Sequence, residues 1–345
     1  TAHGVALIGD PRNDENAIIS QIQANFIALH NILITEAESD PAVRAEISHC
    51  AEMGMSTNDW TDHVPERSML FEKVRRFIRL HYQYVVWEEL LDAFVAQPVR
   101  DEARVTDFFP DAPIMPVEFA GAVYRFGHAT TQPEYVLRDG EAATNMIDIL
   151  GFGHRSAEVQ MKHFFDLDGS PAPKARPVGP ALGLALTALP FIHETVHLRE
   201  IDKELSLPQS RNLPLRNMLR DRYTFELANG ERIAAWFKDV HHRDLPVVEM
   251  HPILRQNGWT KTPLWLYALQ EAEQFGAGKL THVGGSLVAG VIARLLRLDP
   301  TTYWHASGFK PSARFAGAGG VLAGMMKYAE ERRSTIAHVD ELKNG

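Results

Sequence analysis

The spacing of hydrophobic residues along the chain predicts a largely helical protein. Residues 13–36 carry apolar side chains three to four positions apart, with acidic residues at the start, where the helix dipole favours them. Residues 66–96 show the strongest helical pattern in the chain. The apolar stripe of this second segment comprises Leu70, Val74, Phe77, Ile78, His81 and Val85. Pro98 follows it and is expected to end the helix.

Three further helices are predicted downstream, over residues 116–130, 262–276 and about 286–298. A proline can occupy the first turn of each of the first two, and Gly276 closes the second. The best strand pattern is short, near Tyr135–Leu137, ahead of an Asp139-Gly140 turn. Residues 139–180 are rich in Gly, Ser and Pro and are predicted to be loop-like. Since no repeat or boundary interrupts the pattern, we expect one mainly α-helical domain over residues 1–345.

Composition and charge exclude some classes of protein. The chain has 345 residues, 45% of them hydrophobic, and a net charge of −9, which argues against a nucleic-acid partner because phosphate contacts require clustered Lys and Arg. The longest apolar stretch, Ala181–Ile192, is about half the length of a membrane span, so we expect a soluble protein without one. A single cysteine, Cys50, rules out a disulfide framework within the chain and leaves the compartment undetermined.

His128 is the candidate for chemistry that the helical pattern supports. On an α-helix over residues 116–130, one face would comprise Val117, Gly121, Tyr124 and His128. Arg125 would lie one turn before His128. A small residue on that face permits close approach of a flat group, and a haem requires an imidazole for its iron and cations for its propionates. The pattern alone does not separate this role from that of an ordinary core or surface histidine.

Several segments of the chain resemble the animal-type (myeloperoxidase-like) haem peroxidase superfamily, and they occur in the same order as in that superfamily. GDPRNDEN followed by FIALHN resembles the stretch in which a distal Arg and, three residues on, a Glu precede a helix with a His-Asn pair. EFAGAVYRFGH resembles the proximal signature of that superfamily, and LPLRNMLRDR resembles its later motif of Leu, Asn and Arg. TPLWLYALQEAE and the helix after Val283-Gly284-Gly285 look like the C-terminal part of bacterial members.

The resemblance implies an animal haem peroxidase-like helical domain that binds haem b. It implies reduction of hydrogen peroxide and oxidation of an electron donor, which the sequence does not identify. Arg12 would be the distal arginine that polarises bound peroxide. Glu15 matches the position that is ester-linked to haem in some members. Asn16 follows it, and this excludes the sulfonium link that a Met makes there in other members.

On the proximal side, the resemblance implies that His128 is the axial ligand of the haem iron. Asn217 would accept a hydrogen bond from the other ring nitrogen of His128, which fixes the tautomer and the basicity of the ligand. Arg125 and Arg220 would lie near the haem propionates.

Two elements of the superfamily, the distal His and the Ca²⁺-binding loop, lie upstream of the position that Arg12 matches. His3 does not stand in a matching context. We therefore expect the distal His to come from a preceding segment or a separate N-terminal chain, and any Ca²⁺ site to lie there too. Because Arg12 cannot act as a proton shuttle, residues 1–345 alone are expected to bind haem weakly and to react slowly with peroxide.

Three alternative functions remain open at this point. Fatty-acid oxygenases of the same superfamily use a Tyr three residues before the proximal His; here that residue is Arg125, and Tyr124 would be turned by about 100°. A zinc metallopeptidase would use the literal H-E-x-x-H motif formed by His193, Glu194 and His197, which requires both imidazoles on one helical face. The third alternative is a non-catalytic peroxidase-like binding module. The glycine-rich residues 317–324 do not fit a dinucleotide fingerprint and are predicted to be a loop or a helix-packing segment.

Overall fold

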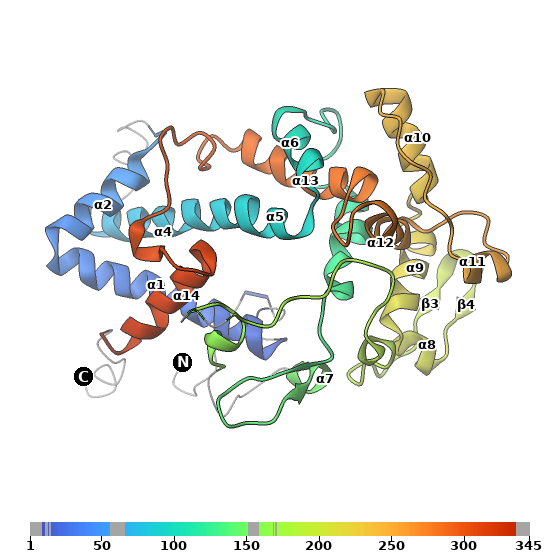
Figure 1. Cartoon of the computed structure of the whole chain (residues 1–345), viewed down its shortest axis with the longest axis horizontal. Coiled ribbons are helices and arrows are strands. Elements are labelled where there is room, and N and C mark those ends of the chain that lie inside the picture. The colour runs from blue at the N-terminus through green and yellow to red at the C-terminus, as the bar shows by residue number, and fades with distance from the viewer. Residues whose placement is uncertain are drawn as a thin grey trace.

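The computed structural model describes residues 9–10, 13, 15–55, 66–150, 159–167, 169 and 171–335. The fold is mainly α-helical, as the sequence predicts, and its helices are joined by long irregular segments (Figure 1). One cluster of buried hydrophobic side chains runs through it from Ala17 to Ala329.

The N-terminal part contains α1 (Ala17–Ser39), α2 (Pro41–Glu52) and α4 (Glu66–Tyr84). The predicted helix over residues 13–36 is confirmed, but it begins at Ala17 because the Asn16 side chain accepts hydrogen bonds from the backbone N–H groups of Ile18 and Ile19. α2 begins in the same way at Asp40, with Pro41 in its first turn.

The structure confirms a long helical run in the region predicted over residues 66–96, but one turn of this run is π-helical. α4 continues through a π-helical turn, η2 (Val85–Leu90), into α5 (Leu91–Phe94). The expected role of Pro98 is wrong: the run ends at Val95, which is extended, and Pro98 lies in the first turn of α6 (Gln97–Val105). A proline is tolerated there because a first-turn N–H has no helical acceptor.

The C-terminal half is built from further helices around α12 and α13. These are α8 (Leu207–Arg211), α9 (Leu213–Tyr223), α10 (Gly230–His241), α11 (Pro252–Gln256), α12 (Leu264–Phe275), α13 (His282–Leu298) and α14 (Gly320–Arg332). The helix predicted to close at Gly276 is confirmed as α12, and the one predicted at 286–298 is α13 with one more turn at its start.

Two short antiparallel hairpins and several single turns interrupt the helices. β1 (Glu134–Tyr135) pairs with β2 (Thr144–Asn145), so the predicted strand near residue 135 and its turn are confirmed, with Gly140 at a φ of 74°. β3 (His197–Leu198) pairs with β4 (Lys203–Glu204). Single turns occur at α7 (Met146–Ile149), η5 (Met161–His163), η6 (Leu184–Thr187), η7 (Arg199–Ile201), η8 (Ala313–Phe315) and η9 (Arg333–Thr335).

The packing of the helices separates two regions of the molecule. α1 packs against α2, α4 and α14, and these lie together on the left of Figure 1. α13 packs against α6 and α12, and α12 in turn contacts α9 and α10. α1 is long and apolar enough to cross a membrane by length and composition, but core helices of globular proteins pass the same test. Part of its apolar surface is buried against α2, α4 and α14, whereas Ile19 and Ile27 are exposed.

The glycine-rich segment packs against its own neighbours, as predicted. Residues 317–319 lead into α14, which contains the rest of the segment. A Cβ on Gly324 would lie 2.0 Å from the backbone oxygen of Phe315, so this position requires glycine.

His81 makes the stability of the fold depend on pH. Its side chain on α4 is fully buried; Nδ1 donates to the Phe77 carbonyl at 2.7 Å and Nε2 accepts from the Ser312 N–H at 2.9 Å. Burial lowers the pKa of His81 from 6.5 to about 4. Between these two pH values the unfolded chain binds a proton that the folded protein excludes.

We therefore expect the free energy of unfolding to fall as the pH drops from about 6.5 to 4, with about 3 kcal/mol of the loss due to His81. Denaturant unfolding at pH 7 and pH 4.5 measures this dependence. His81→Gln should reduce the difference between the two pH values, whereas His49→Gln, at an exposed position on α2, should leave it unchanged. Equal pH dependence in His81→Gln and the parent protein would contradict the assignment.

Candidate functional site

The segment that carries His128 is helical but is not one α-helix. A π-helical turn, η3 (Glu118–Ala122), is followed by a 3₁₀ helix, η4 (Val123–Ala129). The expected α-helix over residues 116–130, with Val117, Gly121, Tyr124 and His128 on one face, is therefore wrong. A π turn contains more than four residues and a 3₁₀ turn about three, so a face calculated with the α-helical period does not apply.

The 3₁₀ geometry places Arg125 and His128 on the same side of η4, because side chains three residues apart eclipse each other there. Tyr124 is four residues before His128 and is turned from it by about 120°. The Tyr124 ring stacks on Phe119, with ring centroids 4.5 Å apart. Gly121 lies where a Cβ would approach the Phe225 ring to 2.8 Å, which explains the small residue in η3.

The structure brings His128 and Asn217 together, 89 positions apart in sequence. Asn217 is 1% exposed and lies inside α9, and its Nδ2 donates to Nδ1 of His128 at 2.9 Å. This contact directs the Nε2 side of the imidazole away from α9. The expected contact between Asn217 and His128 is present, but the expected direction is not: Asn217 was expected to accept from the imidazole, and here its Nδ2 donates to Nδ1.

The amide of Asn217 has a second, unused hydrogen-bonding atom. Its Oδ1 is buried and, within the described ranges, has no hydrogen-bond partner. Rotating the amide by 180° would exchange its oxygen and nitrogen, and Oδ1 would then accept from an Nδ1–H of His128. A histidine that ligates a metal through Nε2 carries its proton on Nδ1 and donates it in this manner. The pair is therefore suited to a metal-bound imidazole.

Positive charge surrounds the imidazole. Three arginines lie close enough to repel one another: Arg125, Arg216 and Arg220. Among the described residues, none of them forms an ion pair with a carboxylate. Burial and the other two arginines lower the pKa of Arg220 to about 10. Uncompensated, partly buried cations favour an anionic group, as the two propionates of a haem would provide. Arg216 was not predicted from the sequence; its place beside Asn217 in LPLRNMLR is the only signal there.

The same environment keeps His128 neutral. Burial, followed by the charges of Arg125 and Arg220, lowers the pKa of His128 to about 4. A neutral imidazole has a free lone pair, which a metal ligand requires. At neutral pH His128 is therefore available for a metal without losing a proton first.

α12 also packs against η4 and supports it. Nε1 of Trp265 donates to the Arg125 carbonyl at 3.3 Å, and the Trp265 backbone N–H donates to Oδ2 of Asp221 at 3.0 Å. Asp221 lies one turn after Asn217 on α9. The first turn of α12, α9 and the His128 segment are thus linked through buried groups. This support was not predicted, because nothing in the sequence pairs residues 125, 221 and 265.

Of the two residues predicted on the distal side, the structure describes only Glu15. Arg12 lies outside the described residues. Glu15 is half-buried just before α1, and no contact in the described part of the chain joins it to His128, Arg125 or Asn217.

The zinc-peptidase alternative requires His193 and His197 to lie on one face of a helix, and the structure shows that this expectation is wrong. His193 and Glu194 lie in an irregular exposed segment, and His197 lies in strand β3, where its Nε2 contacts Asp202 at 3.1 Å. The two histidines therefore do not share a helical face. The described ranges contain no cluster of three or more His, Cys, Asp or Glu side chains arranged to hold a metal ion. Haem iron would need only the single imidazole, so this finding does not bear on His128.

Comparison with known proteins adds no assignment. The sequence matches no profile of a known protein family and no curated protein. The function of the site must therefore be argued from its residues and their geometry.

Proposed function

We propose that this chain is a haem-dependent peroxidase in which His128 is the axial ligand of the haem iron. The observation that carries the proposal is the buried contact between His128 Nδ1 and Asn217, at 2.9 Å. Its setting among three arginines that have no acidic partner in the described residues agrees with a dianionic cofactor.

Each residue has a physical task in this proposal. His128 offers the Nε2 lone pair, and its lowered pKa keeps that lone pair available. Asn217 holds the ring orientation and, with its oxygen turned toward Nδ1, increases the electron density on Nε2. Arg125, Arg216 and Arg220 neutralise the propionates. Trp265 fixes the backbone of η4 at Arg125.

Bound haem b would supply a redox-active iron that reduces hydrogen peroxide while an electron donor is oxidised. On the distal side we propose that Arg12 polarises the peroxide and that Glu15 is the site of an ester link to the haem. A fatty-acid oxygenase of the same superfamily is the second candidate. We favour the peroxidase because Arg125, and not a tyrosine, lies directly above His128 on η4.

Reconstitution with haem b tests the proposal and its pH dependence. At saturating haem we expect one haem per chain and a Soret band, with slow peroxidase turnover of a phenol donor, because Arg12 cannot act as a proton shuttle. Because the pKa of His128 without iron is about 4, and a proton must compete with iron for Nε2, ligation should persist well below pH 6.5 and be lost only at or below about pH 4. A spectrophotometric pH titration measures this midpoint. A protein that takes up no haem even at a large excess of haem, or that loses the histidine-ligated spectrum already at pH 6.5, would refute the assignment.

A further inference from the structure

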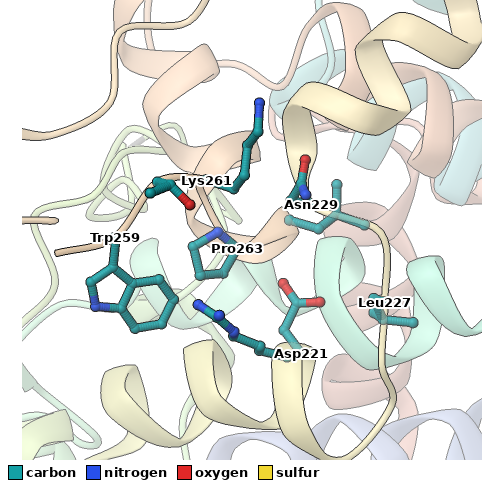
Figure 2. Close-up of a pocket in the computed structure, with 9 residues that line it drawn as sticks. Asp221, Leu227, Asn229, Trp259, Lys261 and Pro263 are labelled. Carbon is teal, nitrogen blue, oxygen red and sulfur yellow. The ribbon is translucent and has the colours of Figure 1, made fainter. Parts of the chain in front are cut away.

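A second site lies at the end of α9, next to the proximal residues but separate from His128. It is a cavity of about 200 Å³ between the end of α9 and the segment that leads into α12 (Figure 2). Its walls include Asp221, Leu227, Asn229, Trp259, Lys261 and Pro263. The proposed peroxidase chemistry assigns no role to this cavity.

Asp221 lines the cavity with a buried carboxyl group, one oxygen of which has no hydrogen-bond partner among the described residues. The residue is 2% exposed and its Oδ2 accepts from the Trp265 backbone N–H at 3.0 Å. Its Oδ1 is buried and, among the described residues, makes no hydrogen bond. Figure 2 shows the carboxyl group facing the space between Asn229 and Pro263. An unpaired buried oxygen is costly, and a ligand that donates a hydrogen bond to it would remove that cost.

The rest of the lining separates into an apolar wall and a cationic mouth. Trp259, Pro263 and Leu264 provide the apolar surface. Arg222 and Lys261 are exposed cations, and the Arg222 guanidinium lies over the Trp259 ring, 5.1 Å from its centroid. The side-chain oxygen of Asn229 is already used, because it accepts from the Arg232 N–H at the start of α10. Its amide nitrogen remains as a donor at the edge of the cavity.

We propose that this cavity binds a small aromatic acid with a hydroxyl group on its ring, of the hydroxybenzoate class. The hydroxyl donates to Oδ1 of Asp221, the ring packs on Trp259 and Pro263, and the carboxylate lies at the mouth near Arg222 and Lys261. The volume is sufficient, since a cavity of roughly 150 Å³ holds benzene. The inference goes beyond the proposed peroxidase function and does not rest on it, because no residue of the cavity ligates the haem.

Titration calorimetry with 4-hydroxybenzoate and benzoate on the unaltered protein tests the role of the hydroxyl. We expect 4-hydroxybenzoate to bind about 10- to 100-fold more tightly, as a hydrogen bond to a buried charged group allows. It should also change the fluorescence of Trp259. Equal affinity for the two acids, or no binding of 4-hydroxybenzoate at millimolar concentration, would overturn the proposal. This comparison needs no variant, so it does not depend on how a substitution affects folding.

Two substitutions test the ends of the ligand separately. Asp221→Asn keeps an acceptor for the Trp265 N–H and removes the charge. The affinity of this variant for 4-hydroxybenzoate should therefore fall to near its affinity for benzoate. Lys261→Ala should weaken both acids by a similar factor, whereas Lys310→Ala, at an exposed position outside the cavity, should weaken neither. If 4-hydroxybenzoate shifts the Soret band of the haem-loaded protein and binds Asp221→Asn as tightly as the parent, it occupies the haem pocket and the proposed cavity site is wrong.

Discussion

If His128 is the axial ligand, as we propose, replacing it by Ala is expected to abolish the haem spectrum of the reconstituted protein. His128 is the proposed axial ligand, and its Nδ1 already has a partner in Asn217. Without the imidazole the iron would lose its bond to the protein, and the haem would be held only by its other contacts and by the proposed ester link to Glu15. We expect a loss of affinity larger than the roughly 10- to 100-fold that follows removal of a group that only supports a ligand. Haem titration followed at the Soret band measures it.

His193→Ala and His197→Ala are the matched controls for this prediction. Both residues are exposed histidines in and before β3, and both should leave the spectrum nearly intact. A His128→Gly variant offers a check on folding, because free imidazole should enter the vacated space and restore ligation. If His193→Ala loses the cofactor while His128→Ala keeps it, the assignment of the ligand is wrong.

Substitutions of Asn217 should tune the haem without removing it. Asn217→Ala removes the hydrogen-bond partner of Nδ1, so the ring becomes a weaker electron donor and the reduction potential of bound haem should rise. Asn217→Asp places a carboxylate there, which draws the Nδ1 proton more strongly, and the potential should fall. The effect on affinity or turnover should be about 10- to 100-fold. Redox titration of the three proteins gives the sign.

The opposite directions of the two Asn217 variants separate a tuning role from a structural one. A residue that only fills space in α9 would give shifts unrelated to charge. Asn257→Ala, at an exposed position after α11, serves as the control and should leave the potential unchanged. Potentials and turnover equal to those of the parent in both Asn217 variants would remove Asn217 from the site.

The helical pattern identified the long helices because each buries one face against the same core. The segments at 66–96 and 262–276 have apolar residues at a regular helical period, and the structure places helices there. At 116–130 the same reasoning failed in detail. The backbone changes from a π turn to a 3₁₀ helix within twelve residues, and close packing of Gly121 on Phe225, which the local sequence does not encode, accompanies that change.

The sequence by itself determined the helical class of this protein and suggested that His128 and Asn217 form a pair, to which we assign the proximal role in our proposal. Local periodicity is sufficient for the first, and the resemblance of two short motifs pointed to the second. Only the tertiary structure decided which distant side chains meet. It placed Asn217 on His128, brought together three arginines that form no ion pair among the described residues, and directed Nε1 of Trp265 at the Arg125 carbonyl. It also showed that His193 lies in an irregular segment and His197 in a strand, so the helix that the motif needs does not form there. These contacts depend on how α9 and α12 pack around η4, and residue spacing along a chain does not contain that information.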